Sequence, residues 1–201
     1  MIVLQKHYFT SNEDLSSELR EIKYHYHDIS FSFYSDLGVF SKDHIDYGSR
    51  FLLETFLNIK ETPDLKVLDM GCGYGFLGIV IAKIKKYAVD MCDINKRAIH
   101  LSKKNMELNG VVSHIFISDV YENVTSKYDV IITNPPIKAG KDILLNILEG
   151  ATNHLKDDGE LWFVMRKDHG LKSTLKILEN KYFLTKIDKS KGFYVILAKK
   201  R

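Results

Sequence analysis

The sequence predicts an α/β protein with a doubly wound, mostly parallel β-sheet and an extension at its N-terminal end. From residue 66 onward, short apolar strand patterns alternate with amphipathic helix patterns, as in successive βα units. A glycine cluster separates the first of these strands from the first helix, as at many ligand-binding turns. The composition, 45% hydrophobic and 27% charged among 201 residues, is that of a globular protein and excludes a disordered or collagen-like chain.

The first 60 residues are expected to form the extension, packed on the core of a main domain at 61–201. Residues 22–26 and 29–35 alternate polar and apolar side chains and are rich in aromatics, so they predict a β-hairpin that turns near Asp28. Residues 46–59 place apolar side chains on one broad face and predict a helix.

The main domain is expected to contribute seven strands. Their ranges are 67–70, 87–92, 111–117, 129–133, 160–165, 182–187 and 193–198, with helices at 76–84, 95–108, 142–155 and 171–179. No helix separates the last two strands, so the last strand is expected to run antiparallel. Ligands of such sheets bind beyond the carboxyl ends of the strands, where the strand order reverses.

The first ligand-binding signal is the sequence Asp-Met-Gly-Cys-Gly-Tyr-Gly at residues 69–75. Gly73, Gly75 and Gly78 have the spacing of the dinucleotide-binding fingerprint, and Asp93 stands where that fingerprint has a ribose-binding acid. Asp69, however, would repel a pyrophosphate at the mouth of the loop. It suits a ligand that carries an amino group and a sulfonium. An NAD-dependent oxidoreductase is therefore the weaker of two interpretations.

The second signal is Asn-Pro-Pro at residues 134–136, which contains two of the three prolines in the chain. The prolines fix the backbone and hold Asn134 and the nearby carbonyls at the end of the strand at 129–133. The Asn134 side-chain carbonyl and the Pro135 backbone carbonyl would accept the two hydrogens of an exocyclic amine and turn its lone pair toward a methyl donor. We therefore assign catalysis to Asn134, Pro135 and Pro136.

Together the two motifs resemble those of class I S-adenosylmethionine-dependent methyltransferases. The segments at 36–41, 46–53 and 134–141 are similar to those of the methyltransferase small domain family, which includes guanine-N2 methyltransferases of ribosomal RNA. The resemblance covers roughly residues 7–200. It implies a Rossmann-like, seven-stranded methyltransferase sheet and S-adenosylmethionine as the cofactor. It also implies methyl transfer to a nucleobase amino group, with guanine N2 in ribosomal RNA as the expected target.

The resemblance also implies a set of site residues. The expected cofactor-binding residues are Asp69, Gly71, Cys72, Gly73, Gly75, Asp93, Ile94, Asp119, Val120 and Asn134, with Asp90 as the alternative to Asp93 for the ribose and with Phe40, Ser41, Asp46 and Gly48 closing the pocket. Related enzymes that act on DNA adenine or protein glutamine carry an aromatic residue after Asn-Pro-Pro, where this chain has Ile137. The residues expected on the substrate side are Ile137, Lys138 and Lys141, with Phe33, Phe40 or Tyr47 replacing the missing aromatic.

Charge bears on the expected partners. Residues 166–201 hold 11 basic and 3 acidic side chains, including Lys199, Lys200 and Arg201, which favours RNA binding; a solvated lysine-rich surface is the alternative. Protein glutamine or DNA adenine as the substrate, and a non-catalytic cofactor-binding subunit, remain alternative functions. No metal is expected, because no Cys or carboxylate stands at ligand spacing around His25 and His27. The apolar runs are too short for a signal peptide or a bilayer span, so a cytoplasmic protein without membrane contacts is expected.

Overall fold

A computed structural model describes residues 17–201 and contains a seven-stranded sheet and a separate two-stranded hairpin. The strands of the large sheet are β3 (Lys66–Met70), β4 (Ala88–Asp93), β5 (His114–Ile117), β6 (Tyr128–Thr133), β7 (Leu155–Arg166), β8 (Tyr182–Ser190) and β9 (Phe193–Lys200), in the order β5-β4-β3-β6-β7-β9-β8. The strands from β5 to β7 pair in parallel, and β9 lies antiparallel between β7 and β8. The expected mostly parallel sheet with an antiparallel last strand is confirmed.

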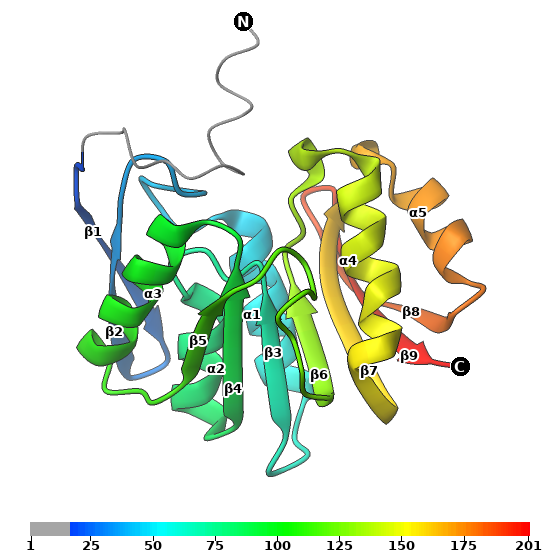
Figure 1. Ribbon diagram of the computed structural model, residues 1–201, viewed down its shortest axis with the longest axis horizontal. Coiled ribbons are helices and arrows are strands. Elements are labelled where there is room, and N and C mark those ends of the chain that lie inside the picture. Colours follow the sequence, from blue (N-terminus) through cyan, green and yellow to red (C-terminus); the bar gives the residue numbers. More distant parts are fainter. Residues whose placement is uncertain (1–16) are drawn as a thin grey trace, which may run out of the picture.

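Helices cover both faces of this sheet (Figure 1). The helices α1 (Tyr47–Ile59), α2 (Phe76–Lys85) and α3 (Lys96–Leu108) pack on one face, and α4 (Lys141–His154) and α5 (Leu171–Leu178) pack on the other. Two short 3₁₀ helices, η2 (Ile137–Ala139) and η3 (Lys167–His169), follow β6 and β7. Because successive strand residues point to opposite faces, Val67 joins the core under α1–α3, and Leu68 joins the core under α4 and α5.

The expected hairpin is present as β1 (Arg20–Tyr26) and β2 (Ile29–Ser35), and its aromatic side chains share a core with α2 and α3. Side chains of α3 pair with the outer edge of β2. The Asn105 amide donates to the Tyr34 carbonyl at 2.9 Å and accepts from the Tyr34 amide at 2.7 Å. Asn109, one helical turn later, makes the same pair with Ser32 at 2.8 and 3.2 Å. At Ser32 and Tyr34 the backbone groups of this edge are therefore satisfied without another strand.

Two strands of the large sheet, β5 and β7, start three or more residues away from their expected first residues. β5 starts at His114 and not at residue 111, because Gly110 adopts a positive φ and the Val111 amide donates back to the Met106 carbonyl, which closes the end of α3. β7 starts at Leu155, which was expected to end the preceding helix. The sequence at 157–159, Asp-Asp-Gly, resembles a turn but lies within β7, where the pairing with β6 is irregular.

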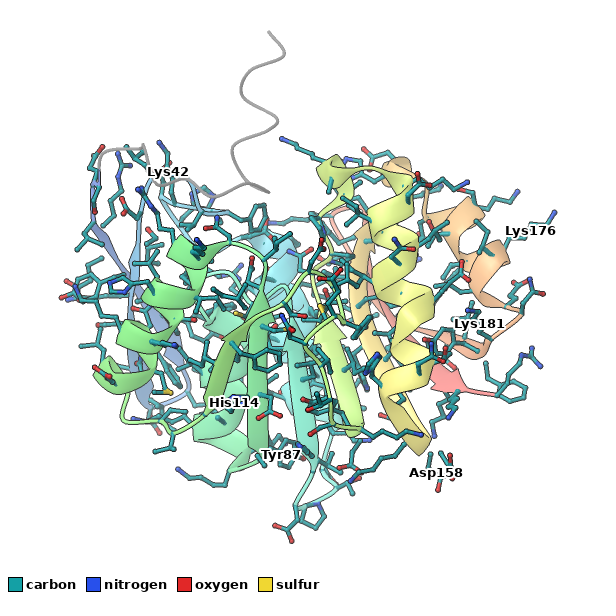
Figure 2. All side chains as sticks on the ribbon, in the orientation of Figure 1. Lys42, Tyr87, His114, Asp158, Lys176 and Lys181 are labelled. Carbon is teal, nitrogen blue, oxygen red and sulfur yellow. The ribbon has the colours of Figure 1, made fainter. Side chains whose placement is uncertain are left out.

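The carboxyl ends of the parallel strands lie at one edge of the sheet, the upper edge in Figure 1. In Figure 2, Lys42 lies near this edge, whereas Tyr87, before β4, and His114, at the start of β5, lie at the opposite edge. β3 and β6 are neighbours although β4 and β5 separate them in sequence, so the strand order reverses between them. The glycine loop follows β3 and the Asn-Pro-Pro segment follows β6, so both motifs lie at the point where ligands of such sheets bind.

Candidate functional site

The glycine loop, residues 71–75, is held against the carboxyl end of β4. The backbone amides of Gly71 and Cys72 both donate to the Cys92 carbonyl at 2.9 Å. The Gly73 amide donates to the Asp93 carboxylate, also at 2.9 Å. Cys72 is buried, and burial raises the pKa of its thiol well above the usual value. These contacts give the loop one fixed path beside the neighbouring strand.

The glycines of the loop differ in what they permit. Gly71, Gly73 and Gly75 all have a positive φ, a conformation that other residues rarely adopt. A Cβ at Gly71 or Gly73 would meet no atom within 4 Å, whereas a Cβ at Gly75 would lie 2.8 Å from Ile79. The first two glycines therefore border open space where a ligand can approach the backbone, and the third allows α2 to pack closely.

Asp69 lies beneath this loop and is fully buried. Its Oδ2 accepts a hydrogen bond from the Gly78 amide at 2.8 Å, in the first turn of α2. Its Oδ1 has no hydrogen-bond partner within residues 17–201. Burial and the nearby Asp93 charge raise the pKa of Asp69 to about 7, although the Gly78 hydrogen bond opposes them. An unpaired buried carboxylate oxygen is costly, so this position favours a ligand that brings a donor or a positive charge.

Asp93 stands at the carboxyl end of β4 and faces the glycine loop. Its Oδ2 accepts from Gly73 and its Oδ1 accepts from the Asn95 amide, each at 2.9 Å. Burial raises its pKa in spite of these bonds. Asp90 lies three residues earlier, and its carboxylate accepts a hydrogen bond from the Tyr128 hydroxyl at 2.8 Å. Of the two acidic candidates on β4, only Asp93 contacts the loop.

The segment after β5 continues the same edge. The Ser118 amide donates to the Asp93 carbonyl at 3.1 Å, and the Ser118 hydroxyl donates to the Val120 carbonyl at 2.8 Å. Asp119 is exposed, Val120 is half-buried, and Ile94 exposes 39% of its surface beside them. The apolar side chain of Ile94 and the exposed carboxylate of Asp119 therefore both lie at the carboxyl ends of β4 and β5.

The loop that leads from β2 to α1 borders the site from the other side. The Asn95 side-chain amide donates to the Gly38 carbonyl at 2.9 Å and ties this loop to the start of α3. Within the loop, the Ser41 hydroxyl donates to the His44 carbonyl, and Phe40 is 56% exposed.

Asn134 follows β6, and the start of α1 holds its side-chain amide. Nδ2 donates to Asp46 Oδ2 at 3.0 Å and to Ser49 Oγ at 2.8 Å. Asp46 is also the N-cap of α1, since the same Oδ2 accepts from the Ser49 backbone amide at 2.8 Å. A carboxylate only accepts hydrogen bonds, so the amide nitrogen must face Asp46. Oδ1 of Asn134 consequently faces away from Asp46, and it has no hydrogen-bond partner in the described chain.

The two prolines turn the chain directly into η2. Pro135 is buried and Pro136 is half-buried. Ile137 packs against the core under α4, so it presents no flat aromatic surface at this corner. Lys138 and Lys141 are exposed beside this corner.

Comparison with known proteins identifies the family. The model of the methyltransferase small domain matches residues 30–197. The chain belongs to this family. It is therefore an S-adenosylmethionine-dependent methyltransferase, and S-adenosylmethionine is its cofactor.

Three relatives of this methyltransferase differ in length. This chain is 39% identical over 204 residues to the uncharacterized protein YbxB of Bacillus subtilis, across 98% of this chain and 100% of that protein. It is 40% identical over 172 residues to ribosomal RNA small subunit methyltransferase C of Vibrio parahaemolyticus, across 81% of this chain and 48% of that one. The solved structure of the 16S rRNA N2 methyltransferase RsmC of T. thermophilus, in complex with AdoMet and guanosine, has a TM-score of 0.82 and 26% identity, across 93% of this chain and 52% of that one. This chain thus spans about half the length of the two ribosomal RNA enzymes.

The three aromatic candidates on the substrate side of the methyltransferase differ in accessibility. Phe33 is fully buried between Tyr74 and Phe76, so it has no free face for a nucleobase, and its assignment to the substrate side is wrong. Phe40 is exposed in the loop before α1. Tyr47, the first residue of α1, is half-buried with its ring centroid 5.4 Å from that of Phe193.

The basic C-terminal residues lie at the edge opposite the glycine loop, because β9 runs antiparallel (Figure 1). Lys199 lies 3.7 Å from Glu160, and Lys200 lies 3.7 Å from Asp157. The Arg201 guanidinium packs 4.2 Å from the ring centroid of Phe183. The expectation that these residues draw RNA toward the site has no support in this arrangement.

Within residues 17–201, no group of three or more His, Cys, Asp or Glu side chains is arranged to hold a metal ion. No helix in that range is both long enough and apolar enough to cross a membrane.

Proposed function

We propose that this methyltransferase transfers a methyl group to an exocyclic amino group of a nucleobase, with guanine N2 in ribosomal RNA as the substrate. The observation that carries the proposal is the fixed amide of Asn134, whose nitrogen is bound by Asp46 and Ser49. Its carbonyl oxygen is left as an acceptor at the carboxyl end of β6. An exocyclic amine needs such an acceptor because its lone pair is delocalised into the base.

The residues around the glycine loop fit the cofactor. The unpaired Oδ1 of Asp69 matches the cofactor's amino group, and the open space over Gly71 and Gly73 suits its methionine part. Asp93 would bind the ribose hydroxyls, and Ile94, Asp119 and Val120 would border the adenine. The bound cofactor supplies an electrophilic methyl group on a sulfonium.

The chain's own contribution to the reaction is orientation and charge stabilisation. Asn134 Oδ1 and the Pro135 carbonyl accept the two hydrogens of the target amine, which turns its lone pair toward the methyl group. The new C–N bond would form as the methyl–sulfur bond breaks, with S-adenosylhomocysteine as the leaving group, and the two carbonyl dipoles stabilise the positive charge that develops on the nitrogen. No strong base is needed before the attack, because the amine attacks in its neutral form. The proton leaves the product nitrogen for solvent.

Two observations support RNA over DNA adenine or protein glutamine. Ile137 stands where enzymes for those substrates carry a stacking ring, and it packs into the core. The relatives from Vibrio parahaemolyticus and T. thermophilus are ribosomal RNA methyltransferases, and the second is solved with guanosine.

The proposal is tested by incubating the protein with S-adenosylmethionine labelled in its methyl group and with separate RNA, DNA and protein fractions. The label is expected in the RNA fraction. Label in the protein or DNA fraction alone would refute the assignment. S-adenosylhomocysteine at ten times its Kd is expected to stabilise the fold by about 1.4 kcal/mol, and NAD is expected to have no effect.

A further inference from the structure

We propose that a cluster of aromatic rings and cations beside Asn134 binds the phosphate backbone of the RNA next to the target nucleotide. The cluster consists of Tyr47, Arg50, Arg166, Lys191 and Phe193, and we name it the cationic rim. The inference rests on the proposed function, because it requires that the substrate carry phosphates.

The rim adjoins the catalytic corner. Tyr47 directly follows Asp46, whose Oδ2 accepts the Asn134 amide at 3.0 Å. A Cβ at Gly48 would lie 2.9 Å from the Phe193 ring and 3.0 Å from that same Asp46 oxygen. Gly48 therefore allows Phe193, from β9, to pack against the start of α1 beside the residue that orients Asn134.

Each cation of the rim lies against a ring. Lys191 Nζ is 4.7 Å from the ring centroid of Tyr47, and the Arg50 guanidinium is 5.7 Å from it. The Arg166 guanidinium is 5.4 Å from the ring centroid of Phe193. Contact with an aromatic face restricts a cation without neutralising its charge, so the charge stays available to an anionic ligand.

Lys191 is the central cation of the rim. It occupies the turn between β8 and β9, and the Tyr47 hydroxyl donates to its neighbour Ser190 at 2.7 Å. Within residues 17–201, no carboxylate lies within 4.0 Å of its ammonium group. Lys199 and Lys200, at the far end of β9, both have carboxylate partners. Of Lys191, Lys199 and Lys200, the lysine without a carboxylate partner is therefore the one that adjoins the site.

The two arginines of the rim have only exposed acidic partners. Arg166 contacts Asp168 at 2.9 Å, and Arg50 lies 4.0 Å from Glu54. Exposed pairs of this kind contribute little stability, so a phosphate can replace the carboxylate at small cost. Arginine also binds phosphate through two parallel hydrogen bonds. The rim thus offers one ammonium group without a carboxylate partner and two guanidinium groups whose carboxylate partners a phosphate can replace.

The test compares Lys191→Gln with the wild-type protein. Both are saturated with S-adenosylhomocysteine and titrated with a fluorescent single-stranded RNA of ribosomal sequence at several salt concentrations. Loss of one phosphate contact is expected to reduce the slope of log K against log salt by about 0.7, which makes binding about fivefold weaker at 0.1 M salt. The matched control is Lys176→Gln (Figure 2). Lys176 lies on α5, which packs on the face of the sheet opposite to α1. Lys176 is also exposed, and its loss is expected to leave the slope unchanged.

A second pair of variants tests the ring. Tyr47→Leu removes the ring against which Lys191 and Arg50 lie but leaves both charges, so it is expected to weaken RNA binding less than Lys191→Gln does. The effects of the two changes are expected to be less than additive in the double variant, because the ring acts in part through Lys191. Tyr47→Phe keeps the ring and is expected to retain the wild-type slope.

The outcomes separate this inference from the proposed function. If RNA is methylated but Lys191→Gln keeps the wild-type slope, the rim is refuted and the function stands. If the wild-type protein methylates no RNA and Lys191→Gln instead weakens binding of an acidic protein substrate, both proposals fail. A reduced slope in Lys191→Gln together with an unchanged one in Lys176→Gln supports the rim.

Discussion

Two carboxylates, the buried Asp69 and the half-buried Asp93, lie beside the glycine loop with different hydrogen bonding. Both oxygens of Asp93 accept backbone amides, whereas Asp69 has one oxygen without a partner in the described chain. Burial raises the pKa of both, and that of Asp69 reaches about 7. A cation next to the unpaired oxygen would favour the ionised form, so Asp69 is the residue at which the cofactor's amino group gains most.

The affinity for S-adenosylhomocysteine, which keeps this amino group, is expected to rise about tenfold between about pH 6 and about pH 8, as Asp69 loses its proton. Calorimetric titration across this range measures it. Asp69→Asn is expected to bind more weakly and with no such dependence. In the cofactor-free protein the raised pKa of Asp69 has the opposite consequence. The protonated Asp69 carboxyl adds to the free energy of unfolding below about pH 4, and this contribution is lost as the pH rises through about 7, because the buried carboxyl must then ionise. A flat affinity profile in the wild-type protein would contradict this role.

Asp46 is expected to act on turnover by orienting Asn134. Asp46→Ala removes the acceptor that fixes the amide, so kcat is expected to fall about tenfold, with a smaller change in the Kd for S-adenosylhomocysteine. Asp46→Asn can still accept from Nδ2 and cap α1, so it is expected to keep most of the activity. Steady-state kinetics and melting temperatures on both variants distinguish orientation from helix capping. Wild-type kcat in Asp46→Ala would remove Asp46 from the mechanism.

At the scale of elements, the N-terminal hairpin is attached through the side chains of α3. Asn105 also donates to the Tyr74 carbonyl at 2.8 Å, so the same amide contacts both β2 and the glycine loop. The hairpin and the loop are therefore held by one helix.

Asn105→Ala is expected to lower the free energy of unfolding by about 1–3 kcal/mol, because the backbone groups of Tyr34 lose their partners. Urea denaturation measures this change. Asn153→Ala, an exposed position on α4, is the matched control and is expected to change stability by less than about 0.5 kcal/mol. Equal stability of Asn105→Ala and the control would show that the side-chain pairing contributes nothing.

At the scale of the whole molecule, local patterns were sufficient for most of the architecture. Each strand of the sheet carries its own apolar run, and the glycine loop and Asn-Pro-Pro segment follow two of them, so the topology alone brings the motifs to one edge. Asp93 directly follows the strand pattern at 87–92, so its place at the carboxyl end of β4 could be predicted as well.

Contacts between distant segments could not be predicted in this way. The bond from Asn134 to Asp46 spans 88 positions, and the sequence placed Asp46 at the start of a helix and, by resemblance, at the cofactor pocket, but not beside Asn134. Ser49 was missed for the same reason. Phe33 was misassigned because alternation in a hairpin does not reveal which face packs on a helix. The place of the C-terminal lysines depended on the direction of β9 and on partners in other strands.

The central claim is that Asn134 directs methyl transfer to a nucleobase amine, and analysis of the methylated nucleoside tests it most directly. RNA treated with the wild-type protein and S-adenosylmethionine is digested to nucleosides and analysed by mass spectrometry; N2-methylguanosine is the expected product. Asn134→Ala is expected to form it about 10²–10³ times more slowly, with little change in cofactor affinity or melting temperature. N2-methylguanosine formed at the wild-type rate by Asn134→Ala, or a methyl group on a ring carbon or ribose oxygen, would contradict the account.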